Sequence, residues 1–122
     1  MARVPPDEQR EERIAMEIIV DAYGPEEQAV GWHVYLTDHL RFPFKAHCLA
    51  QRATSPLEVG DAVEVVEMAS EEECQHEMFV GIRWKRRLLA VPLAQLEAVQ
   101  VDEETEQALQ DWRYWVNRGY EL

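Results

Sequence analysis

The chain has 122 residues, the size of one domain, and 47% of them are hydrophobic, including four tryptophans. Its 24 acidic and 12 basic residues give a formal net charge of −12, which disfavours nucleic acid as a partner. No apolar run approaches the roughly 20 residues that span a bilayer, and the polar N-terminus lacks a signal peptide. We therefore expect a cytoplasmic protein with no membrane partner, whose two cysteines are free thiols.

Two helices are predicted at the N-terminal end. Apolar residues recur at i, i+4 and i+8 over residues 7–23, which is typical of an amphipathic helix. Gly24 is expected to end this helix in the left-handed conformation. Pro25 suits the first turn of a second helix, which is predicted to run to about Leu40. Residues 1–6 are expected to be flexible.

A small β-sheet is predicted in the middle of the chain. Pro43 forces the residue before it out of the helical region, and apolar and polar residues then alternate. The patterns predict strands at residues 44–52, 62–68, 78–85 and 88–93, the last two joined by a tight connection through "KRR". About four short strands at this spacing indicate a small curved antiparallel sheet or a partial barrel.

A C-terminal helix is predicted from about Glu103 to Arg118. Asp102 is a suitable N-cap, and Gly119 stands where a left-handed C′ residue belongs. The chain is thus predicted to be a single α+β domain over residues 1–122, with two N-terminal helices, the sheet and the C-terminal helix. The aromatic residues in the helices recur at helical spacing, and we expect them in the core; the alternative is a ligand-binding aromatic patch.

An acidic loop, Glu71, Glu72 and Glu73, stands directly before the third predicted strand. A Ca²⁺ ion takes about six to eight oxygen ligands from carboxylates, carbonyls and water. An irregular loop supplies such oxygens more readily than a strand does, because its carbonyls are not committed to a ladder. The alternative is a solvated loop with no ligand, which is the usual state of a run of like charges.

Asp38 is a second candidate ligand. It falls in the last predicted turn of its helix, where its charge opposes the macrodipole and where the final carbonyls lack intrahelical partners. A carboxylate beside unpaired carbonyls is half of a calcium site. The alternative is that Arg41 or His39 offsets the charge of Asp38.

Other kinds of site find little support. Counting an EF-hand loop from Asp38 or from Glu71 puts proline or histidine where its central glycine belongs. The cysteines and histidines lack the spacing of structural zinc sites, and no phosphate loop or nucleophile motif indicates an enzyme. The basic run "RWKRR", residues 83–87, holds four of the twelve positive charges, and its expected partner is the protein's own acids or an acidic partner protein.

The chain as a whole resembles the calcium-binding proteins of the CcbP kind. The resemblance covers about residues 12–120 and is carried in order by "ERIAMEIIVDAYGPEEQAVGW", "FPFKAHC", "SPLEVGDAVEV", "MASEEECQHEMFVGIRW", "LAVPLAQL" and "DWRYWVNRGY". It implies an acidic α+β protein that binds Ca²⁺ without a standard EF-hand and that buffers or sequesters calcium. It also implies Asp38 as a calcium ligand and draws attention to Glu71–Glu73.

The sequence therefore predicts an intracellular calcium buffer or sensor with no catalytic activity. The expected metal ligands are Asp38, Glu71, Glu72 and Glu73. The alternative function is an acidic protein-interaction module without a specific metal site.

Overall fold

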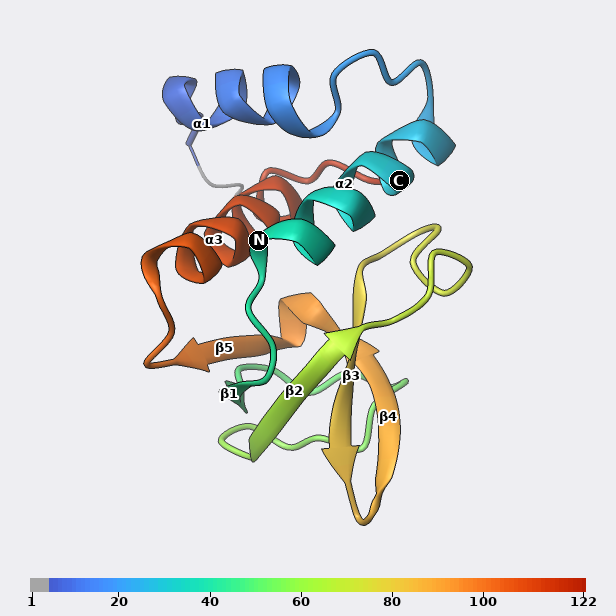
Figure 1. The fold of residues 1–122 in the computed structure, drawn as a ribbon, viewed down its shortest axis with the longest axis vertical. Helices are drawn as coiled ribbons and strands as arrows, with labels where there is room; N and C mark the ends of the chain where they lie inside the picture. The colour runs from blue at the N-terminus through green and yellow to red at the C-terminus, as the bar shows by residue number, and fades with distance from the viewer. Residues whose placement is uncertain (1–4) are drawn as a thin grey trace.

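A computed structural model describes residues 5–122 and shows helices packed against one side of a β-sheet (Figure 1). Residues 1–6 were expected to be flexible, and residues 1–4 of that stretch lie outside the described residues. In chain order the elements are α1 (Glu8–Arg13), the π-helical turn η1 (Ile14–Ile18), α2 (Pro25–His39), β1 (Phe44–Cys48), β2 (Ala62–Met68), β3 (Phe79–Trp84), β4 (Arg87–Pro92), the 3₁₀ turn η2 (Leu93–Gln95), β5 (Leu96–Val99) and α3 (Glu103–Asn117).

The sheet is antiparallel and open, with the strand order β4-β3-β2-β1-β5. The α+β class is confirmed, but the sheet has five strands where about four were predicted, and the first predicted strand is shorter, ending at Cys48. The fifth strand has only four residues and pairs with β1, far away in sequence. A short strand whose partner is non-local leaves little periodic signal, so the pattern did not reveal it.

The first helix is shorter than predicted. After Arg13 the chain makes a π-helical turn, in which the Ile19 amide donates to the Ile14 carbonyl at 3.0 Å, and the helix ends there. Asp21 follows with a φ of 58°. The expectation for Gly24 was wrong, because its φ of −167° is extended and the residue is the N-cap of α2. The π turn had already ended the first helix several residues earlier.

The other two helices lie where the pattern places them. α2 begins at Pro25 and ends at His39. α3 begins after Asp102, whose carboxylate accepts the Thr105 amide at 2.8 Å, so the predicted N-cap is confirmed. Gly119 follows α3 with a φ of 87°, as expected for a C′ glycine. No helix among residues 5–122 combines the length and apolarity needed to cross a bilayer.

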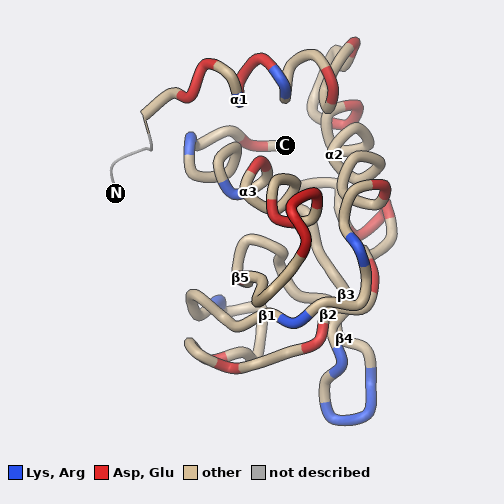
Figure 2. Tube along the Cα trace, turned by 60° about the vertical axis from the view of Figure 1, so that its left-hand side comes forward, with Lys and Arg blue, Asp and Glu red and all other residues tan. Residues whose placement is uncertain are grey.

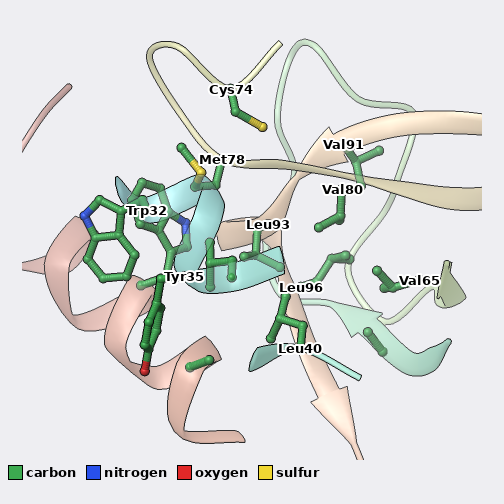
Figure 3. Close-up of a cluster of buried hydrophobic side chains, with 14 of the residues drawn as sticks. Trp32, Tyr35, Leu40, Val65, Cys74, Met78, Val80, Val91, Leu93 and Leu96 are labelled. Atoms are coloured by element: carbon green, nitrogen blue, oxygen red, sulfur yellow. The ribbon is translucent and has the colours of Figure 1, made fainter. Parts of the chain in front are cut away.

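The core lies between the helices and the sheet. Trp32 of α2 meets Trp112 and Trp115 of α3 with ring centroids 5.0 and 5.7 Å apart, which confirms the expected core role of these aromatics. Figure 3 shows Trp32 on the helical side of this cluster and Val80 and Val91 on the sheet side. The cysteines are free and buried. The core therefore holds α2 at a fixed distance from the end of β2, where the acidic loop begins.

Candidate metal site

The acidic loop joins β2 to β3 and is wrapped around a buried thiol. Cys74 is 1% exposed, and its sulfur accepts the Phe79 amide at 3.3 Å (Figure 3 shows Cys74 above Met78). The Ser70 carbonyl accepts the amides of Glu73 and Cys74, each at 3.1 Å. Burial raises the pKa of the Cys74 thiol, so the thiol stays neutral. Because the inside of the turn is filled by Cys74, the glutamates before it point into solvent.

Two further contacts fix the ends of this loop. The Nε2 atom of His33 on α2 lies 2.7 Å from the Ala69 carbonyl, so Nε2 carries the proton and donates it. At the other end, Arg52 donates to both carboxylate oxygens of Glu77, at 2.8 and 3.1 Å. This bidentate bond raises the pKa of Arg52. The loop backbone is thus anchored on α2 and on the preceding loop.

A surface groove separates the acidic loop from the N-terminal half of α2. It has a volume of about 320 Å³. Its polar walls come from Glu26 in the first turn of α2 and from Glu71, Glu72 and Gln75 of the loop, and His33 closes one side. The groove therefore receives carboxylates from two segments that are far apart in sequence.

Glu73 faces elsewhere. It lines a separate groove with Glu67 and Gly81, on the outer side of β2 and β3. The turn around Cys74 causes this division, because consecutive residues of a tight turn point in different directions. The three adjacent glutamates are therefore split between two grooves.

Asp38 lies in the last turn of α2 and is exposed. It is twelve positions beyond Glu26, or about 18 Å along the helix axis. The two residues that the alternative interpretation paired with its charge have other partners. Arg41 forms an ion pair with Asp102 at 3.0 Å, and His39 contacts the Tyr35 carbonyl at 2.8 Å. Asp38 thus places a solvated carboxylate, not offset by either of these residues, beside the carbonyl end of a helix.

Within residues 5–122, no three histidine, cysteine, aspartate or glutamate side chains are gathered closely enough to hold a metal ion. The donors around the 320 Å³ groove nevertheless fit one kind of ion. Carboxylate and amide oxygens come from Glu26, Glu71, Glu72 and Gln75, no thiolate lines the groove, and the imidazole of His33 already uses Nε2 to bond the Ala69 carbonyl. Such hard ligands suit Ca²⁺ rather than zinc or copper.

Sequence reasoning did not identify Glu26 and Gln75 as companions of the acidic loop. Glu26 has the ordinary signature of a first-turn helix acid, which the macrodipole favours. Its second role arises only because the loop packs against α2, and that packing depends on the His33–Ala69 contact across 36 positions. No spacing rule in the sequence contains this information.

Comparison with known proteins identifies the family. A family model named Calci_bind_CcbP and described as calcium binding matches residues 12–116. The chain belongs to the CcbP family of calcium-binding proteins. The crystal structure of Anabaena CcbP is similar, with 44% identity, complete coverage of both chains and a TM-score of 0.87. A structure described as a calcium binding protein in the calcium-binding form shares 40% identity, with complete coverage of both chains and a TM-score of 0.87.

A search of curated proteins gives no match. Membership of the CcbP family confirms the resemblance seen in the sequence, together with Ca²⁺ as the expected ligand. The similarity to Anabaena CcbP extends over the whole chain, so the sheet, α2 and the acidic loop all lie within the shared fold.

Proposed function

We propose that this CcbP-family chain is a cytoplasmic, non-catalytic Ca²⁺ buffer with two separate acidic sites and no EF-hand. The first site is the groove between α2 and the acidic loop, with Glu71, Glu72 and Glu26 as its carboxylate ligands. The second consists of Asp38 and the carbonyls at the end of α2. The observation that carries the proposal is that these three glutamates line one groove in a member of a calcium-binding family.

Glu73 has a smaller part in this proposal. It lies on the far side of the turn with Glu67, so it contributes to the general negative potential that attracts cations. As a ligand it would belong to a different ion from Glu71 and Glu72. The proposal therefore expects its removal to have less effect than removal of either neighbour.

The anchoring of the loop favours a buffer over a sensor. A sensor changes the packing of helices and exposes an apolar surface when calcium binds. Here the loop backbone is held by His33, Cys74 and Arg52, and only glutamate side chains need to move to surround an ion. Binding of this kind leaves the core unchanged and shows no new surface to a partner.

Isothermal titration of chelator-stripped protein with Ca²⁺ tests the proposal. In about 150 mM KCl with a few millimolar Mg²⁺, diffuse attraction is screened while a true site persists. The variant Glu71→Gln with Glu72→Gln should lose one binding event, and Asp38→Asn should lose another. The matched control Glu103→Gln with Glu104→Gln removes the same charge from the exposed start of α3 and should bind like the wild type.

The outcomes separate the two candidate functions. If the loop double variant and its control weaken the heat signal equally, the binding is diffuse and the site assignment is wrong. A flat titration of the wild type would favour the protein-interaction module instead. Tryptophan emission that does not change during saturable binding is the result expected for a buffer.

A further inference from the structure

The tip of the β3–β4 hairpin concentrates positive charge on an otherwise acidic protein. Arg83, Lys85, Arg86 and Arg87 are all exposed and make up four of the twelve basic residues. Figure 2 shows this tip as a blue loop that projects at the end of the molecule opposite α1. The calcium proposal uses none of these residues.

Neither turn geometry nor protection of the sheet edge accounts for the charges of Lys85 and Arg86. Lys85 and Arg86 form a two-residue turn closed by the Trp84–Arg87 pair, with φ values of 48° and 70°. Such turns favour asparagine and glycine, which adopt positive φ most easily. Cations that protect an edge strand act along its paired length, whereas Lys85 and Arg86 lie beyond the last pair.

The local contacts show what these cations bind. The Nε atom of Arg83 lies 2.6 Å from a carboxylate oxygen of Glu64, and the Lys85 ammonium lies 5.6 Å from the centroid of the Trp84 ring. Among the described residues, Arg86 and Arg87 form no ion pair. Guanidinium groups bind carboxylates in a planar, bidentate manner. The tip therefore presents two arginines that can accept carboxylates from outside.

Within residues 5–122, an unpaired strand edge lies directly beside these arginines. β4 is at the end of the sheet order. The Trp84–Arg87 pair closes the hairpin and is hydrogen-bonded, and along an antiparallel ladder hydrogen-bonded and non-hydrogen-bonded pairs alternate. The amides and carbonyls of Leu88 and Ala90 therefore point away from β3. Both residues are exposed, Leu88 by 55%. Pro92 has no amide and ends this row of free groups.

We infer that the edge of β4 binds an extended acidic segment of a partner protein as an additional strand. The backbone of that segment pairs with Leu88 and Ala90, and its carboxylates reach Arg86 and Arg87. Glu67 and Glu73 line the groove beside Ala90 and would repel carboxylates there. The acidic residues of the bound segment therefore lie only at the end near the hairpin tip. The inference rests on a different face from the proposed calcium sites and is independent of them.

Fluorescence polarisation with a labelled peptide of three glutamates followed by alternating valine and threonine tests the inference on the full chain. We expect saturable binding that weakens as salt rises. Lys85→Asn with Arg86→Gly keeps a favourable turn while removing two charges and should weaken binding roughly tenfold. Ala90→Pro removes an outward-facing amide without removing a hydrogen bond to β3 and should abolish binding, whereas Ala90→Thr should retain it.

Thermal unfolding of each variant confirms that the hairpin is intact. Binding that is unchanged in both the tip variant and Ala90→Pro would overturn the inference, as would equal binding of a peptide with three lysines. Absence of peptide binding by the wild type would also overturn it. If the wild type instead binds phosphatidylserine vesicles through the same tip without binding the peptide, the acceptor is a membrane surface and the partner assignment is wrong.

Discussion

The Nη2 atom of Arg13 lies 2.5 Å from the Oδ1 atom of Asp111, joining the first helical segment to α3 across 98 positions of the chain. Asp111 is fully buried. Its carboxylate also accepts a hydrogen bond from the Tyr35 hydroxyl at 2.8 Å and lies 3.2 Å from Arg10. One buried carboxylate thus connects α1, α2 and α3.

Replacing Asp111 should destabilise the fold strongly. Asp111→Ala leaves Arg13 and Arg10, both largely buried, without their counter-charge, and loss of one partner of a buried ion pair costs about 3 kcal/mol or more. Urea unfolding followed by tryptophan emission measures the change. The control Glu104→Gln removes an exposed acid from the same helix and should leave the midpoint almost unchanged. Equal midpoints for Asp111→Ala and the wild type would contradict a central role for this carboxylate.

Tyr35 makes stability depend on alkaline pH. Burial, and then its hydrogen bond to Asp111, raise the pKa of Tyr35. The folded state therefore favours the neutral phenol, so the free energy of unfolding is unaffected below about pH 10, the usual tyrosine pKa, and falls as the pH rises above it. Urea unfolding between about pH 8 and 11 measures this slope. Tyr35→Phe should make the slope shallower, whereas Tyr23→Phe, at a side chain that is 91% exposed, should not.

Gly31 is needed where α2 crosses the π-helical turn. A Cβ atom at this position meets the Ile18 carbonyl oxygen, a backbone atom that cannot move aside, at far less than contact distance. Gly31→Ala should destabilise the protein by about 2 kcal/mol, despite the higher helix propensity of alanine. Gly24→Ser is the matched control, because a Cβ atom there would meet nothing within 4 Å beyond its chain neighbours, the φ of Gly24 is extended, and serine is a good N-cap for α2. A thermal midpoint lowered only by Gly31→Ala would verify the close crossing.

The Cys74 thiol should control calcium affinity without being a ligand. Cys74→Ala removes the acceptor of the Phe79 amide and the filling of the turn, so we expect a loss of about 1–2 kcal/mol in stability. The loosened loop should also weaken calcium binding, since Glu71 and Glu72 are then less well positioned. Cys48→Ala, at a buried thiol on β1, should lower stability alone. Calcium titration and urea unfolding of both variants distinguish positioning from general destabilisation.

Local signals in the sequence predicted local structure well. Pro25 and Asp102 marked the starts of α2 and α3 correctly, because a helix N-terminus is determined by residues within a few positions. The failures depend on contacts between distant segments. β5 becomes a strand only because β1 lies beside it, and Gly24 caps α2 because the preceding helix has already ended in a π turn.

In the candidate site, too, the sequence indicated the local features and missed those that depend on contacts between distant segments. The sequence drew attention to Glu71, Glu72 and Glu73 as one group, because they are adjacent in the chain and equally charged. Their separation into two grooves depends on how the turn folds around Cys74, and the addition of Glu26 depends on the packing of α2. Adjacency in sequence was therefore a good guide to charge and a poor guide to which groove each side chain lines.

Because of the buried thiol of Cys74, the shape of the acidic loop does not depend on the carboxylates that the loop carries. The turn keeps its shape through the sulfur and the hydrogen bonds of Ser70, and the carboxylates of Glu71–Glu73 take no part in those bonds. Exchanging these carboxylates for other side chains leaves the scaffold intact while changing the number of oxygens offered to a cation. If the loop holds an ion as we propose, mutations in it raise or lower calcium affinity over generations without endangering the fold, and relatives can diverge in capacity there.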